Sequence, residues 1–118
     1  MGLVGKVCVV TGASSGIGRR TALDLASEGA VVCAAARRED RLRSLVDELS
    51  GDSHSYFVTD VSDRANVKAL AEHVRERYGR CDVLVNNAGF GSSRAFDGPE
   101  AADEVERVMR TNFLGAVY

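Results

Sequence analysis

Several residue types are scarce in this chain of 118 residues, which has one proline, no tryptophan and three cysteines. No apolar run approaches the roughly 18 residues that a membrane helix needs, so we expect no membrane span. Neither sign of charge dominates, because 15 basic and 17 acidic side chains give a formal net charge of −2. This balance argues against nucleic acid or an anionic membrane as a partner.

The three cysteines, Cys8, Cys33 and Cys81, form no CxxC pair, and the first two lie within apolar runs. A thiol in such a run behaves as a small hydrophobic side chain, and this spacing favours neither a redox site nor a metal site. The first ten residues also lack the charged lead-in of a signal peptide. We therefore expect a cytoplasmic protein with reduced cysteines and no metal.

Four short apolar runs recur along a chain whose composition is that of one globular domain, with 45% hydrophobic and 27% charged residues. The runs are continuous rather than alternating, as expected for strands buried on both faces of a parallel sheet. They span residues 7–10, 31–34, 56–58 and 83–85.

The segments between these runs have helical periodicity. Apolar residues at the spacing i, i+3, i+4, i+7 mark the second and third helices: Leu42, Leu45, Val46 and Leu49, then Val67, Leu70, Ala71 and Val74. The first helix, from about residue 16 to 28, has a weaker stripe of Ile17, Ala22, Leu25 and Ala26. A last helix is predicted from about residue 99 or 100 onward.

Residues typical of helix ends flank these segments. Ser62 is placed to cap the start of the third helix, and glycines follow the three helices as left-handed C-caps: Gly29, Gly51 and Gly79. The alternation of strand and helix predicts an α/β fold, a Rossmann-like, doubly wound parallel sheet with the strand order 3-2-1-4.

A glycine-rich segment joins the first predicted strand to its helix. Ligands of an open parallel sheet bind beyond the carboxyl ends of its strands. Glycine allows a phosphate to approach the backbone, and the helix N-terminus offers free N–H groups to a pyrophosphate. Glycines that serve only a tight turn are the alternative. The candidate residues are Gly12, Ser14, Ser15, Gly16, Ile17 and Gly18.

Two arginines, Arg37 and Arg38, follow the second predicted strand. In dinucleotide sites this position faces the adenosine ribose, where an acidic residue accepts the 2′-hydroxyl of NAD. A guanidinium suits a phosphate instead, which favours NADP over NAD. The alternatives are that the arginines solvate the helix start and that Glu39 or Asp40 contacts the ribose.

Asp60 and Val61 follow the third predicted strand. One interpretation has the carboxylate bonded to the adenine amino group and Val61 packed on the ring. The other is an acidic residue favoured near the N-terminus of the next helix.

Asn86, Asn87, Ala88 and Gly89 follow the fourth strand. Amides that leave a buried strand need hydrogen-bond partners, and the two small residues permit a close approach of the backbone; a simple turn is the alternative. Asn112 lies on the apolar stripe of the last predicted helix, where a polar side chain is either functional or a satisfied core residue.

Together these segments resemble the short-chain dehydrogenase/reductase family. The segment 11–18 matches its TGxxxGxG cofactor loop, Asp60-Val61 its adenine-contacting pair, and 86–89 its NNAG motif. The resemblance implies an oxidoreductase that passes a hydride between a nicotinamide and an alcohol or carbonyl carbon. It also implies that Asn112 belongs to the catalytic tetrad. Arg37 and Arg38 match the basic positions of members that prefer NADP.

One departure from the family pattern concerns catalysis. No YxxxK motif occurs in the 118 residues, where Lys6 and Lys68 are the lysines, and no serine stands at the family's catalytic position. We expect the cofactor-binding, N-terminal part of a longer domain, inactive alone, whose complete protein forms a homo-oligomer. The alternatives are a short nucleotide-binding protein without catalysis and a different Rossmann enzyme such as a methyltransferase, against which Arg37 argues.

Overall fold

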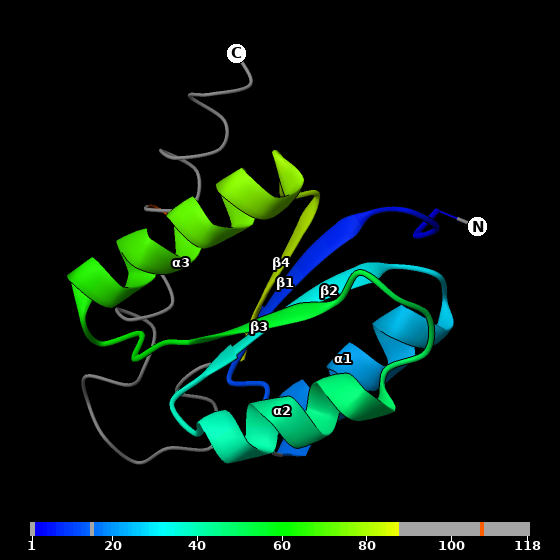
Figure 1. Cartoon of the computed structure of the whole chain (residues 1–118), viewed down its shortest axis with the longest axis horizontal. Coiled ribbons are helices and arrows are strands. Elements are labelled where there is room, and N and C mark those ends of the chain that lie inside the picture. Colours follow the sequence, from blue (N-terminus) through cyan, green and yellow to red (C-terminus); the bar gives the residue numbers. More distant parts are fainter. Residues whose placement is uncertain (1, 15, 88–106, 108–118) are drawn as a thin grey trace.

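Four parallel strands form one sheet in a computed structural model that describes residues 2–14, 16–87 and 107. The strands are β1 (Val7–Thr11), β2 (Val31–Ala36), β3 (Ser55–Val58) and β4 (Val83–Asn86). Their order is β3-β2-β1-β4, as predicted (Figure 1). The strands extend the predicted apolar runs by one or two residues.

In the part of the chain that the structure describes, three helices cover the two faces of this sheet. They are α1 (Gly16–Ser27), α2 (Glu39–Glu48) and α3 (Arg64–Tyr78). Helices α1 and α2 lie on one face, and α3 lies on the other (Figure 1). This arrangement confirms the predicted Rossmann-like α/β fold.

The core consists of two apolar clusters, one on each face of the sheet. Every residue of β1 is buried, because this central strand lies between β2 and β4 and is covered on both faces. Val9 contributes to the cluster under α3, together with Val67 and Leu70. Val10 contributes to the cluster under α1 and α2, with Leu42 among its members. The prediction of double-sided burial is therefore confirmed for the central strands β1 and β2. It is wrong for the outer strands of the described sheet, because β3 and β4 are only partly buried and Val58 of β3 is 43% exposed.

The predicted stripe of α1 is wrong at its first residue. Ile17 is 61% exposed, and the buried residues of the helix are Gly18, Ala22 and Ala26. Residues 18, 22 and 26 are spaced four apart and therefore share one face of the helix. Small side chains on that face allow α1 to lie close to the sheet, which leaves the larger Ile17 outside.

Two predicted caps are also wrong. Asp63, not Ser62, caps α3, because its carboxylate accepts the N–H groups of Ala65 and Asn66 at 2.9 and 3.4 Å. Helix α2 ends at Glu48 and its C-cap is Leu49, in extended backbone, so Gly51 is not its C-cap. Gly79 caps α3 in the left-handed conformation, as predicted.

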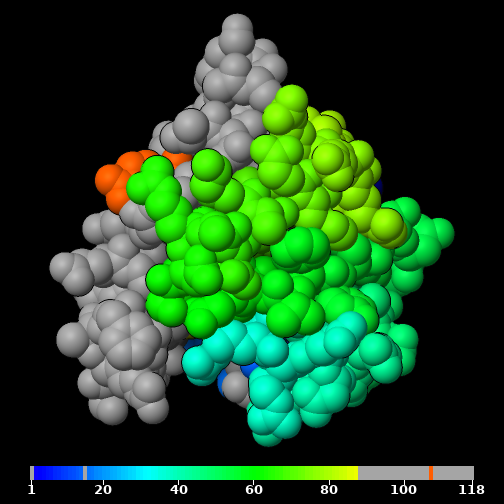
Figure 2. Space-filling model, turned by 60° about the vertical axis from the view of Figure 1, so that its left-hand side comes forward, coloured from blue at the N-terminus to red at the C-terminus, as the bar shows by residue number. Residues whose placement is uncertain are grey.

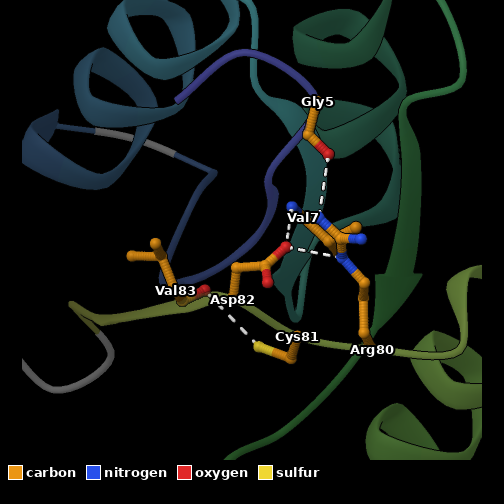
Figure 3. A network of polar contacts seen from close by, with 6 residues as sticks. All are labelled: Gly5, Val7, Arg80, Cys81, Asp82 and Val83. Atoms are coloured by element: carbon orange, nitrogen blue, oxygen red, sulfur yellow. Dashed lines mark hydrogen bonds and ion pairs between the residues drawn. The ribbon is translucent and has the colours of Figure 1, made fainter. Parts of the chain in front are cut away.

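A polar network fastens the start of β4 to the start of β1 (Figure 3). The carboxylate of Asp82 accepts the backbone N–H of Val7 and the Nε–H of Arg80, both at 2.8 Å. The backbone N–H of Asp82 in turn donates to the carbonyl of Val7 at 2.8 Å. Burial alone would raise the pKa of Asp82, but the hydrogen bonds from Val7 and Arg80 hold it below its ordinary value. This network sets the register of the two strands.

Some predicted features lie outside the described residues: Ser15, Ala88, Gly89, Asn112 and the last helix. None of the helices in the described ranges has the length and apolarity needed to cross a membrane.

Candidate functional site

Most of the predicted site residues gather at one edge of the sheet. Because all four strands run parallel, the segments that follow β1, β2, β3 and β4 meet at what we call the carboxyl edge. In the space-filling view the cyan residues at the start of α2 border the green residues that follow β3 (Figure 2). The electrostatic interaction of Arg37 with Asp60 joins the same two segments.

The glycine loop between β1 and α1 is held by backbone geometry that only glycine meets without strain. Gly12 and Gly16 have φ values of 64° and 61°. A Cβ on Gly18 would lie 2.1 Å from the carbonyl oxygen of Gly12, so the start of α1 packs directly on the loop backbone. A Cβ on Gly16 would meet nothing within 4 Å. The Gly16 side of the loop can therefore receive a ligand close to its backbone.

The first turn of α1 favours an anionic group. It contains no acidic residue, so the partial positive charge of the helix N-terminus is not neutralised by its own side chains. Ile17 is exposed at this helix start, and Ser14, just before it in the loop, is partly exposed. The donors and the shape of the loop fit a pyrophosphate.

Thr11 connects the ends of β1 and β4, a role that the sequence reasoning missed. Its buried hydroxyl lies 3.4 Å from the carbonyl oxygen of Val85 and 3.3 Å from Oδ1 of Asn86. A hydroxyl residue at the end of an otherwise apolar strand is the signal that could have identified it. The contact holds the glycine loop beside the segment that begins with Asn87.

Asn87 has the one buried side-chain polar atom without a hydrogen-bond partner in the part of the chain that the structure describes. This atom is the amide nitrogen Nδ2, a donor. An unsatisfied buried donor costs about 1–3 kcal/mol. Such a cost is typical of a position where a polar ligand supplies the missing acceptor.

Arg37 differs from its neighbours at the end of β2. The guanidinium of Arg38 lies 3.4 Å from Asp40, while Arg37 forms no hydrogen bond or ion pair with the described residues. Its charge acts on Asp60 across the carboxyl edge. Arg37 is therefore an exposed cation at the end of β2 that is available to an anionic ligand.

Both carboxylates that could replace the arginines as ribose ligands are engaged elsewhere. Asp40 pairs with Arg38. Glu39 accepts the hydroxyl of Tyr56 at 3.0 Å and lies 3.5 Å from Arg43. A hydrogen bond between Arg43 and Tyr56 is the largest cause that raises the pKa of Arg43, and the charge of Glu39 raises it further. The contact between Tyr56 and Glu39 was not foreseen from the sequence.

Asp60 forms a local turn rather than a helix cap. Its Oδ1 accepts the hydroxyl of Ser62 at 2.6 Å and the backbone N–H of Ser62 at 3.0 Å. These bonds, chiefly that of the hydroxyl, lower the pKa of Asp60, so the carboxylate is charged at neutral pH. The residue that caps α3 is Asp63, three positions further along. Val61 is partly buried against the apolar cluster under α3.

The cysteines lie away from this chemistry. Burial raises the pKa values of Cys33 and Cys81 to about 11 and also raises that of Cys8, so their thiols are protonated at neutral pH. Within the described ranges, no three His, Cys, Asp or Glu residues are grouped to hold a metal ion.

Comparisons with known proteins agree with this geometry. A family model described as short chain dehydrogenase matches residues 6–118. A 3-oxoacyl-acyl-carrier-protein reductase of Thermotoga maritima is 50% identical over 92 residues, which cover 76% of this chain and 37% of the relative. Momilactone A synthase of Oryza sativa is 41% identical over 114 residues, or 96% of this chain and 42% of the relative.

Solved structures of short-chain dehydrogenases and reductases are similar to this chain in fold. L-sorbose reductase of Gluconobacter frateurii, in complex with NADPH and L-sorbose, has a TM-score of 0.84 and 32% identity over 96% of this chain and 49% of its own. A short-chain dehydrogenase/reductase of Burkholderia phymatum, in complex with NAD, has a TM-score of 0.82 and 31% identity over 98% of this chain and 46% of its own. The chain spans less than half the length of each of these relatives.

Proposed function

The chain belongs to the short-chain dehydrogenase family, and from this premise we propose that it is the cofactor-binding part of an NADP(H)-dependent oxidoreductase. The observation that carries the choice of NADP is the state of the charged residues after β2. Arg37 is available there, and both nearby carboxylates are engaged by other side chains. An exposed guanidinium attracts a 2′-phosphate, and carboxylates that are engaged by other side chains offer no acceptor to a 2′-hydroxyl.

The remaining groups of the carboxyl edge divide between the other parts of the cofactor. Gly12, Ser14, Ser15, Gly16, Ile17 and Gly18 would hold the pyrophosphate at the start of α1, with Arg37 and Arg38 beside the ribose phosphate. Asp60 and Val61 would contact the adenine. Asn87, followed by Ala88 and Gly89, would supply donors and bare backbone to the nicotinamide side. The free donor Nδ2 of Asn87 supports that last assignment.

When bound, the cofactor supplies or accepts the hydride, and the proposed substrate is an alcohol or a carbonyl compound. The residues of this chain bind and orient the cofactor. Asn112, which lies outside the described residues, is the proposed catalytic residue of the chain. We also propose a cytoplasmic homo-oligomer, and the three free cysteines support a reducing compartment.

Reversal of the charge at Arg37 tests the cofactor assignment. Arg37→Asp should weaken NADPH binding by about 10- to 100-fold, because a charge-assisted bond to phosphate contributes about 1.5–3 kcal/mol. NADH binding should be unchanged or stronger. Fluorescence titration of the protein with each cofactor measures both.

Arg41→Asp is the matched control. It makes the same charge change on an exposed residue of α2, four positions after Arg37. Equal affinity of the unmutated protein for NADPH and NADH would contradict the assignment. Equal losses in the two variants would show a nonspecific effect of charge rather than a phosphate contact.

A further inference from the structure

We propose that Tyr56 determines the cofactor preference indirectly, because its hydroxyl holds the carboxylate of Glu39 away from the phosphate-binding arginines. This inference rests on the proposed function and identifies a positioning residue for it. Glu39 is the first residue of α2 and lies two positions after Arg37. Of the carboxylates near Arg37 in sequence, it has the longer and more flexible side chain.

The geometry makes Tyr56 a fixed anchor. Its ring is packed on the apolar cluster under α1 and α2, which includes Leu42 and Leu45 of α2. The phenol therefore cannot follow Glu39 if the carboxylate moves. The hydrogen bond of 3.0 Å between the two side chains joins β3 to the start of α2 across 17 positions of sequence.

Arg43 contacts the same carboxylate oxygen of Glu39, Oε2, as the hydroxyl of Tyr56. It lies one helical turn from Glu39, at 3.5 Å, and both side chains of this pair are more than half exposed. An exposed ion pair of this kind constrains its members weakly. The neutral hydroxyl on a packed ring is the stronger geometric restraint, so its removal frees Glu39 to reach toward Arg37.

A free Glu39 has two effects on a 2′-phosphate at Arg37. It neutralises the guanidinium by pairing with it, and it repels the phosphate directly. Both effects lower the affinity for a 2′-phosphorylated ligand and leave the affinity for its unphosphorylated counterpart unchanged. The structure thus places the control of cofactor preference on β3, one strand away from the residues that contact the phosphate.

The test compares the binding of 2′,5′-ADP and 5′-AMP, two probes that differ by the 2′-phosphate, by calorimetry on the protein that contains this chain. Tyr56→Phe keeps the packed ring and removes the hydroxyl. It should weaken 2′,5′-ADP binding about two- to fivefold, the size expected for an exposed charge interaction, without changing 5′-AMP binding. Glu39→Gln should bind 2′,5′-ADP at least as well as the unmutated protein.

The double variant Tyr56→Phe/Glu39→Gln shows whether Tyr56 acts through the charge of Glu39. It should bind both probes as Glu39→Gln does. A Tyr56→Phe variant that binds both probes like the unmutated protein, weakens both equally, or keeps its defect in the Glu39→Gln background would overturn the inference while NADP preference stands. An unmutated protein that binds the two probes equally would overturn the proposed function, and the inference with it.

Discussion

Where the strands begin, at the amino edge of the sheet, polar groups contact one another, whereas at the carboxyl edge a buried donor and an exposed cation have no hydrogen bond or ion pair within the described residues. Asp82 fastens β4 to β1, and His54 accepts the backbone N–H of Val32 at 3.0 Å. At the carboxyl edge, Asn87 Nδ2 is buried without a partner, and Arg37 has no ion pair within the described residues.

The two edges of the sheet therefore have different roles, one in stability and the other in ligand binding. The amino edge satisfies its hydrogen bonds internally and stabilises the register of the strands. The carboxyl edge keeps donors and a cation available and uses glycines in conformations that other residues avoid. Substitutions at the first edge should therefore change the free energy of unfolding, and those at the second should mainly change binding.

Gly18 lies at the carboxyl edge, but its substitution should change both the free energy of unfolding and cofactor binding. This is the largest effect that we expect. Gly18→Ala places a methyl group 2.1 Å from the backbone oxygen of Gly12, a contact that backbone movement must relieve. We expect a loss of about 3 kcal/mol in the free energy of unfolding, measured by urea denaturation, together with a loss of NADPH binding. Gly2→Ala is the control, because a Cβ there meets nothing within 4 Å. A normal unfolding midpoint for Gly18→Ala would contradict the observed packing.

Asp82 should affect stability alone. Asp82→Ala leaves the N–H of Val7, a residue 5% exposed, without its side-chain acceptor and should cost about 1–2 kcal/mol in urea denaturation. Asp82→Asn retains an acceptor oxygen and should cost less. Because the fold lowers the pKa of Asp82, its contribution is present above the ordinary value of 3.8 and is lost as the pH falls below it. Weaker NADPH binding in a folded Asp82→Ala variant would contradict the assignment of stability to the amino edge and binding to the carboxyl edge.

His73 gives the smallest expected effect, a change in the pH dependence of stability. Burial lowers its pKa below the ordinary 6.5, and its ring lies against Phe57 and near the hydroxyl of Ser55. Unfolded histidine then binds protons that the folded protein does not, so the free energy of unfolding should decrease as the pH falls below about 6.5. His73→Gln should remove this part of the dependence in thermal melts at a series of pH values. Identical pH profiles for the two proteins would contradict it.

The local patterns of the sequence predict most of the fold. Continuous apolar runs and the stripes of α2 and α3 depend on residues close in sequence, and the sheet order is the one expected for a Rossmann-like alternation of strand and helix. The errors occur where contacts between distant segments decide the outcome. Ile17 was placed on the buried face of α1, but the approach of Gly18 to Gly12 determines which face meets the loop. Ser62 and Asp63 are adjacent and both can cap a helix, so sequence alone does not separate them.

The sequence predicts which residues form the candidate site, but not which of their side chains are hydrogen-bonded or paired. The sequence places Arg37, Asp60 and Asn87 after successive strands, and parallel strands bring them to one edge. Whether Glu39 is free to pair with Arg37 depends on a side chain far along the chain. The hydroxyl of Tyr56 engages Glu39 from β3, a tertiary contact without a local signature.

Hydrogen exchange followed by mass spectrometry, with and without NADPH, tests the difference between the two edges most directly. We expect slower exchange in peptides covering residues 12–18 and 36–40 when NADPH is bound. Peptides covering residues 50–56 and 79–83, at the amino edge, should exchange at unchanged rates. Protection confined to the amino edge, or no protection at residues 12–18 at saturating NADPH, would contradict this expectation.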